Sequence, residues 1–190
     1  MEVKERIITA ERFFELGEQP EYQDRVLELV EGVIIEMPKP KRIHGVVVAR
    51  LALRIANIVD AHELGEVTVG DAGFILERGG ASGRDTVRGL DIAFVNGERL
   101  STPPDYTWYE IGPDLAVEVI SPSNKIDDIH LKVTQLLNAG ARLIWLVHPL
   151  TRSVEAHTPD GATTLHEDDT LTGGDVLPGF ELRVGDIFPG

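Results

Sequence analysis

A single acid inside an otherwise apolar run constrains this chain more than any other feature. Residues 113–123 have the composition of a buried β-strand, except that Glu118 stands in their middle. An ionised carboxylate that is buried without a partner is strongly destabilising, so such an acid is normally paired, hydrogen-bonded or bound to a cation. Because side chains alternate along a strand, Asp114 and Glu118 share one face, and we expect both acids to look into one cleft.

The residues that follow this run predict a crossover unit. Residues 127–139 have apolar side chains at the spacing of a helix with one buried face, and Gly140 stands where helices commonly end. Residues 141–149 then return as a second buried β run. A strand, a helix and a second strand in this order predict two parallel neighbours in one sheet.

The rest of the chain reads as an α/β protein. Its 190 residues and 42 % hydrophobic content suit one core, so we expect a single domain over residues 1–190. Two loops are expected, one at 79–83 and one that begins at 101–104 and carries Trp108 and Tyr109. The other expected elements are a helix over 10–16 capped by Thr9, a hairpin of 25–30 with 33–37, a helix over 43–58, β runs at 65–76 and 90–95, a hairpin of 153–157 with 163–165, and a final strand near 182.

Composition excludes several classes of protein. The chain has no cysteine, no apolar run long enough to cross a bilayer, and charged residues over positions 1–6, so we expect a cytoplasmic protein. Zinc bound by thiolates is excluded, and the six histidines lack the close pairs that metal-binding helices use. The net charge of −14 argues against a protein that coats nucleic acid through bulk electrostatics, so any phosphate contact must be local.

One segment has the opposite charge. Residues 38–59 contain no acid, and the helix expected there begins at His44. Its basic side chains could face phosphates, and the alternative is the solvated face of an amphipathic helix. The candidate nucleic-acid contacts are Lys39, Lys41, Arg42, His44, Arg50 and Arg54.

A second acid, Asp91, begins the β run at 90–95 and alone would be read as a strand-end aspartate. With Glu118 on an adjacent strand it forms a pair of oxygen ligands that suits Mg²⁺ or Mn²⁺. A lysine usually stands two residues after the second acid, where this chain has Ile120. Lys132, on the following helix, offers a substitute that could orient a water or neutralise charge on phosphate, and Asp128 one turn earlier could pair with it.

The chain resembles the Uma-type restriction-endonuclease family of the PD-(D/E)XK nuclease superfamily. The resemblance implies a restriction-endonuclease-like core, which is a mixed β-sheet flanked by helices with peripheral hairpins. It also implies a Mg²⁺- or Mn²⁺-dependent endonuclease of DNA with Asp91, Glu118 and Lys132 as catalytic residues. Two departures are Leu90, where the family often has proline, and His148, where it often has an acid. The matching pieces are residues 29–38, His44, 90–95, 113–123, Asp128 with Lys132, 144–147 and 177–180.

A competing hypothesis is a catalytically silent, dimeric binding or regulatory protein that keeps the nuclease fold. The acidic net charge and the missing in-strand lysine favour it. A third reading, a sugar-cleaving pair of carboxylates, is disfavoured because only 6 % of the residues are aromatic. Nucleases that cut both strands usually act as symmetric dimers, so a homodimer is expected in either of the first two cases.

Overall fold

The computed structural model describes residues 7–79, 84–100 and 107–189 of the chain. These residues form, in chain order, α1 (Ala10–Gly17), β1 (Val26–Val30), β2 (Val33–Met37), α2 (Arg42–Ala61), β3 (Gly65–Glu77), β4 (Thr86–Asn96), the 3₁₀ turn η1 (Gly97–Arg99), β5 (Leu115–Val119), α3 (Ile126–Asn138), β6 (Leu143–His148), β7 (Ser153–Thr158), β8 (Gly161–Leu165), β9 (Thr170–Thr172), β10 (Glu181–Arg183) and the 3₁₀ turn η2 (Val184–Ile187).

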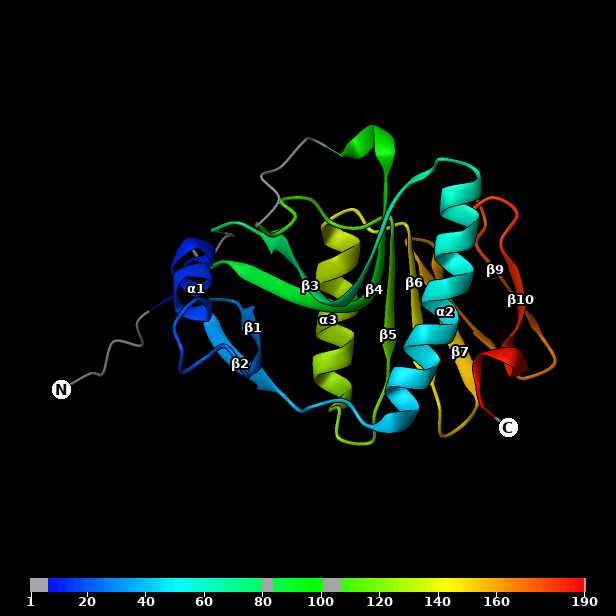
Figure 1. Ribbon diagram of the computed structural model, residues 1–190, viewed down its shortest axis with the longest axis horizontal. Coiled ribbons are helices and arrows are strands. Elements are labelled where there is room, and N and C mark those ends of the chain that lie inside the picture. The colour runs from blue at the N-terminus through cyan, green and yellow to red at the C-terminus, as the bar shows by residue number, and fades with distance from the viewer. Residues whose placement is uncertain (1–6, 80–83, 101–106, 190) are drawn as a thin grey trace.

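One mixed sheet of eight strands organises the chain (Figure 1). Its order is β2-β1-β4-β5-β6-β7-β8, and β3 pairs with β4 outside this path. A separate small sheet joins β9 to β10. The helices α2 and α3 lie on opposite faces of the large sheet. The predicted mixed sheet flanked by helices is therefore confirmed.

The N-terminal elements form as local sequence signals predict. The Thr9 hydroxyl accepts the Arg12 N–H at the start of α1. The strands β1 and β2 pair as an antiparallel hairpin. Its turn consists of Glu31 and Gly32, which both have positive φ, as a two-residue hairpin turn of this twist requires.

The predicted crossover unit is present. β5 and β6 are parallel neighbours with α3 between them in the chain. Gly140 has a φ of +96°, a backbone conformation that L side chains rarely adopt and that suits the residue after a helix. The unit sets the C-terminal end of β5 next to the start of α3 (Figure 1).

Two apolar layers hold the helices to the sheet. On one face, α2 buries Val47, Leu51 and Ile55 together with Val117 and Trp145 of the sheet, and residues of β9, β10 and η2 complete this layer. On the other face, α3 buries Val133 and Leu136 against residues of β4, β5 and β6. The alternation of β5 between these layers follows the period of two expected of a strand. Glu118 therefore projects on the α3 side, like Ala116.

One expectation about Asp114 is wrong. The Asp114 carboxylate accepts the Asn96 N–H at 2.8 Å and forms an ion pair of 2.8 Å with Arg99. It lies four residues before Glu118, which corresponds to about 13 Å along a strand. The two acids share a sheet face without sharing a cleft, because Asp114 is held at the far end of β5.

The two predicted loops lie partly outside the described residues. The loop expected at 79–83 lies outside the described residues except for Gly79. The loop expected to begin at 101–104 lies outside them as far as residue 106, whereas Trp108 and Tyr109 are described. None of the helices in the described part of the chain is long and apolar enough to span a bilayer.

Candidate functional site

The two acids singled out in the sequence lie on adjacent antiparallel strands. β4 and β5 pair with Ile92 opposite Val117, and the next position along this register sets Asp91 opposite Glu118. The Val119 N–H donates to Asp91 Oδ2 at 2.7 Å. Side chains on directly opposite residues project from the same face of a sheet, so the structure brings these two carboxylates together.

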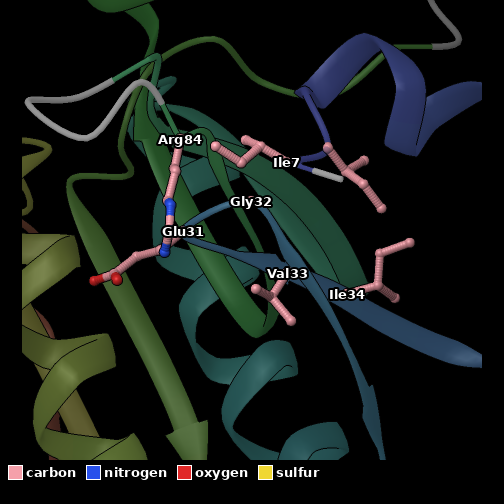
Figure 2. A pocket seen from close by; sticks show the side chains of 7 residues that line it. Ile7, Glu31, Gly32, Val33, Ile34 and Arg84 are labelled. Carbon is pink, nitrogen blue, oxygen red and sulfur yellow. The ribbon is translucent and has the colours of Figure 1, made fainter. Parts of the chain in front are cut away.

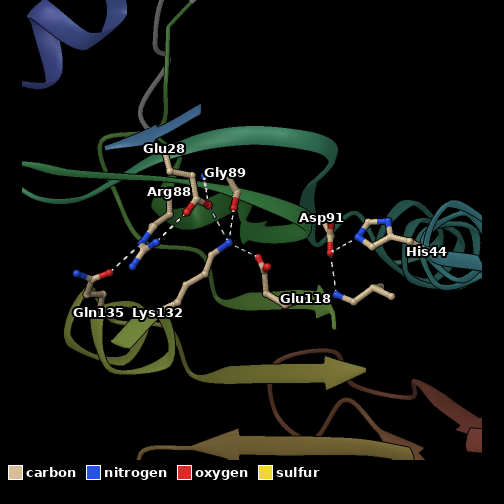
Figure 3. Close-up of polar contacts among 9 residues, drawn as sticks. Glu28, His44, Arg88, Gly89, Asp91, Glu118, Lys132 and Gln135 are labelled. Atoms are coloured by element: carbon tan, nitrogen blue, oxygen red, sulfur yellow. Dashed lines mark hydrogen bonds and ion pairs between the residues drawn. The ribbon is translucent and has the colours of Figure 1, made fainter. Parts of the chain in front are cut away.

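Lys132 reaches Glu118 from α3 (Figure 3). Its Nζ donates to Gly89 O at 2.8 Å and to Glu28 Oε1 at 3.0 Å, and it forms an ion pair of 2.8 Å with Glu118 Oε1. The predicted pair with Asp128 is wrong. Asp128 is exposed in the first turn of α3, whereas the Lys132 amine points toward the sheet, where three acceptors surround it.

Ile120 stands where the lysine was expected, two residues after Glu118, and it contributes to the core. Ile120 packs against the apolar layer beneath α3, and its N–H donates to Val147 O at 2.8 Å. The strand therefore continues its pairing with β6 at this point. An ammonium can reach Glu118 only from another element, and α3 supplies it through Lys132.

Sequence reasoning missed Glu28, which lies in β1 with only 3 % of its surface exposed. Its Oε1 accepts both the Lys132 amine and the Gly89 N–H, the latter at 3.2 Å. Its Oε2 accepts Arg88 Nη1 at 2.8 Å, and Arg88 Nε donates to Gln135 Oε1 at 2.9 Å. The sequence carried a signal for Glu28, because this acid interrupts an apolar β run in the same way as Glu118 does.

The electrostatics of this cluster set Glu118 apart from its neighbours. Burial is the largest cause that raises the pKa of Glu118 to about 7; Lys132 opposes the rise, and the charges of Asp91 and Glu28 add to it. Burial would lower the pKa of Lys132, but Glu118 and Glu28 outweigh it and raise that pKa to about 12. Burial also opposes ionisation of Glu28, but Lys132 and Arg88 prevail and hold its pKa below the ordinary value. Lys132 is thus an ammonium at neutral pH, and Glu118 is the acid that lacks sufficient compensation.

His44 contacts the site from the first turn of α2. Its Nε2 lies 3.0 Å from Asp91 Oδ2, the oxygen that also accepts the Val119 N–H. The hydrogen bond to Asp91 raises the pKa of His44. The structure therefore sets His44, which was predicted to contact nucleic acid, against one of the predicted metal ligands.

A β-bulge brings one more acid toward the cluster, and sequence reasoning missed it. β3 has two residues, Gly70 and Asp71, where β4 has only Asp91. Both bulge residues have positive φ, 80° and 61°. Atoms of Asp71 lie 3.1 Å from the point where a Cβ on Gly89 would stand, so Asp71 fills the side-chain space of that glycine. Burial, and then the charge of Asp91, raise the pKa of Asp71.

The predicted nucleic-acid residues do not all lie together. Three of them are exposed around the start of α2, at the end of the helix that carries His44: Lys39, Lys41 and Arg42. Arg54 is also exposed, but it lies about 18 Å farther along the helix axis than Arg42. Arg50 donates to the carbonyl oxygens of Phe188 at 2.6 Å and Asp186 at 3.4 Å, so it ties α2 to the C-terminal segment.

A shallow pocket lies elsewhere, at the turn between β1 and β2 (Figure 2). Its volume of about 110 Å³ is well below the several hundred Å³ of typical ligand pockets. None of the acids around Lys132 lines it. Its lining residues are Ile7, Ile8, Glu31, Gly32, Val33, Ile34 and Arg84.

The fold and the cluster together define the class of protein. A mixed sheet flanked by helices, with two acids on adjacent strands and a lysine from the following crossover helix, is a restriction-endonuclease-like α/β arrangement. A family model described as "Uma2: Putative restriction endonuclease" matches residues 10–185. The chain therefore belongs to the Uma2 family.

A solved structure has the same fold. It is described as "a putative nuclease belonging to DUF820" from Anabaena variabilis, and it aligns with a TM-score of 0.80 over 95 % of this chain and 97 % of that chain. The sequence identity is 19 %, so this likeness concerns the fold. No curated protein matches the chain.

Proposed function

We propose that the chain is an endonuclease that hydrolyses phosphodiester bonds of DNA with a divalent metal, Mg²⁺ or Mn²⁺, held by Asp91 and Glu118, and with Lys132 assisting. The observation that carries the proposal is the state of Glu118. Its buried Oε1 forms one ion pair, of 2.8 Å with Lys132, and the pKa of Glu118 is nevertheless raised to about 7, so this single cation compensates the buried charge only in part. A second cation beside such a carboxylate would stabilise its charged form, which burial disfavours.

The donor set fits a hydrated hard cation. Asp91 uses one oxygen, Oδ2, for its contacts with His44 and the Val119 N–H, so its other oxygen could take a further ligand. Within the described residues, no three His, Cys, Asp or Glu side chains are arranged to hold a metal ion. Mg²⁺ commonly binds through one or two carboxylates and completes its shell with water and substrate phosphate. Two carboxylates suit this ion better than Ca²⁺ or a structural zinc, which need more protein ligands.

The side chains of this chain then have distinct roles. When bound, the cation would polarise the phosphate and lower the pKa of a coordinated water. Lys132 is charged at neutral pH because its pKa is about 12, so it would stabilise the negative charge that grows on phosphate oxygens rather than remove a proton from water. His44 would hold Asp91 in one orientation through Oδ2.

Local contacts would bring DNA to the site despite the net charge of −14. Lys39, Lys41 and Arg42 surround the N-terminal end of α2, where the helix dipole is positive, and no side chain of the described residues caps that end. This end carries His44 and so lies beside Asp91. Arg54 would contact a more distant phosphate, and Arg50, bound to two backbone carbonyls, would contribute least of the predicted set.

We also propose that the protein acts as a homodimer. One site cuts one strand, and two sites related by a twofold axis match the symmetry of the two strands of a duplex. Sedimentation at several protein concentrations, with and without duplex DNA, would test this part. A monomer under all conditions would limit the enzyme to nicking or to single strands.

The decisive experiment is a cleavage assay with purified protein. Supercoiled, linear and single-stranded DNA are incubated with Mg²⁺, Mn²⁺ or EDTA, and the products are resolved by size. Cleavage is expected with either metal and absent with EDTA, because Asp91 and Glu118 act only through the cation.

Two variants make the result interpretable. Glu118→Gln keeps the shape of the side chain and should abolish cleavage. Glu181→Gln, on the exposed strand β10, should cleave like the native protein. Equal cleavage by native protein and Glu118→Gln would identify a contaminating nuclease. Specific DNA binding without metal-dependent cleavage would favour the catalytically silent, dimeric binding or regulatory protein.

A further inference from the structure

We propose that Glu28 is a positioning residue for Lys132, and that Arg88 and Gln135 hold Glu28 in place for this purpose. The proposal rests on the nuclease function proposed above. It assigns a role to a buried network that is needed only because the lysine comes from a helix instead of the strand that carries Glu118.

The three hydrogen-bond donors of the Lys132 ammonium have three partners. Two partners belong to the scaffold, Glu28 Oε1 and Gly89 O, and the third is Glu118. Lysine has a long, flexible stem, so a single contact would leave its amine in many positions. The two scaffold contacts fix the amine at a point from which the third donor faces Glu118 (Figure 3).

Glu28 is suited to hold Lys132 and unsuited to bind a metal or substrate. Both of its oxygens are occupied, Oε1 by Lys132 and the Gly89 N–H, and Oε2 by Arg88. With 3 % of its surface exposed, it is closed to DNA. A bound metal at Glu118 would therefore leave the contact between Glu28 and Lys132 intact.

The network closes into a ring. Arg88, whose side chain is 5 % exposed, binds Glu28 through Nη1 and Gln135 through Nε. Gln135 stands three residues after Lys132, so both project from one face of α3. The ring thus runs from Lys132 through Glu28 on β1 and Arg88 on β4 back to α3 at Gln135. Each member restricts the next, and the position of the Lys132 amine relative to β4 and β5 follows from all four.

The test removes the ring without leaving an unpaired buried charge. Glu28→Leu combined with Arg88→Met replaces the pair by apolar side chains of similar size, which proteins commonly tolerate. The matched control is Glu36→Leu with Arg25→Met, an exposed ion pair on the same hairpin. Single-turnover cleavage, DNA affinity and melting temperature are measured for both.

Loss of positioning predicts a specific pattern. The Glu28→Leu/Arg88→Met variant should cleave about 10- to 100-fold more slowly, as is typical when a residue that orients a catalytic group is removed. Its affinity for DNA should stay within about twofold, since the ring touches no phosphate. Glu28→Gln keeps an oxygen acceptor for Lys132, so it should cleave faster than Glu28→Leu/Arg88→Met and more slowly than the native protein. The control pair should cleave at the native rate.

Dependence on Lys132 separates positioning from a general structural role. In a Lys132→Met background, the Glu28→Leu/Arg88→Met change should alter the cleavage rate less than about twofold, because the positioned group is already absent. The same rate loss in both backgrounds, or a fall in DNA affinity that matches the fall in rate, would overturn the proposal.

A crystal structure of the Glu28→Leu/Arg88→Met variant gives a readout that needs no activity. The Lys132 amine should leave Gly89 O and Glu118, and an amine that stays in place would refute positioning. If the native protein cleaves no DNA, the proposed function fails, and this structure still decides whether Glu28 positions Lys132.

Discussion

Substitution of Glu118 by glutamine should change how stability depends on pH, in a direction that the structure determines. The pKa of Glu118 is raised from 4.5 to about 7, first by burial and then by the charges of Asp91 and Glu28. The folded protein thus binds this proton more tightly than the unfolded chain does. The free energy of unfolding must therefore fall as pH rises from about 4.5 to about 7, and Glu118 contributes no further fall above that value.

The size of the effect follows from the same pKa values. Each tenfold change in proton affinity corresponds to about 1.4 kcal/mol, so this group should reduce the free energy of unfolding by about 3 kcal/mol across the interval. Glutamine cannot ionise, so the variant lacks this loss. His44 and Asp71 also have raised pKa values, but they titrate in both proteins, so the difference between the two stability curves reports Glu118 together with its small contribution to the raised pKa of His44.

Urea unfolding in EDTA, measured from about pH 5 to about pH 8, would reveal the difference. The native protein and Glu118→Gln should have similar stability at the acid end, and the variant should be the more stable at the alkaline end. Added Mg²⁺ should raise the free energy of unfolding of the native protein by about 2.7 kcal/mol at a hundredfold excess over the dissociation constant. It should change that of the variant little. Parallel curves with a constant deficit in the variant, and no response to Mg²⁺, would show that Glu118 is an ordinary satisfied acid.

Four further outcomes are expected. His44→Asn should lose stability mainly at low pH, and the deficit should close as pH rises through the raised folded pKa of His44, a trend that urea unfolding would follow. Lys41→Gln and Arg42→Gln should each lower the slope of log affinity for duplex DNA against log salt by about 0.9, and unchanged slopes would mark a merely solvated helix end. Asp71→Gly should raise the free energy of unfolding by about 1 kcal/mol because glycine accepts a φ of 61° without strain, and a decrease would mean that the carboxylate stabilises the bulge. Arg50→Met should lower the melting temperature and leave DNA affinity unchanged; weaker binding at unchanged melting temperature would return Arg50 to the phosphate contacts.

The parts of the fold that were predictable from the sequence depend on local periodicity. The apolar runs, the helix that ends before Gly140 and the turn at Glu31 each carry their own signal, and together they predict a crossover unit and a hairpin. The proximity of Asp91 to Glu118 followed from placing two acids on neighbouring strands. Their roles as metal ligands stay a prediction.

The unpredicted parts depend on contacts between distant segments. Glu28 is 60 positions from Arg88 and 104 from Lys132, so no local pattern joins them. The local rule that pairs residues four apart on a helix suggested Asp128 as the partner of Lys132. Buried acceptors on β1 and β4 prevail over that exposed acid, because a charge inside the protein gains more from a partner than a charge in water does.

The bulge in β3 was equally hidden. A strand that gains one residue relative to its neighbour looks the same in sequence as a regular strand, and only its register with β4 reveals the shift. The pair of residues at the bulge, Gly70 and Asp71, is typical of turns, which is the one signal that the sequence offered.

The positions of Glu28, Arg88 and Lys132 along the chain also set when the cluster around Lys132 can form during synthesis. At about 5–20 residues per second, a ribosome adds Lys132 about 5 to 20 s after Glu28. In that interval the hairpin can form and Glu28 can pair with Arg88, but no ammonium reaches Glu118. A nascent or truncated chain that ends before α3 therefore carries Glu28 and Glu118 but lacks the Lys132 ammonium that contacts both. Only a chain translated through the crossover helix can complete the cluster, so the proposed activity would belong to the finished protein and not to its fragments.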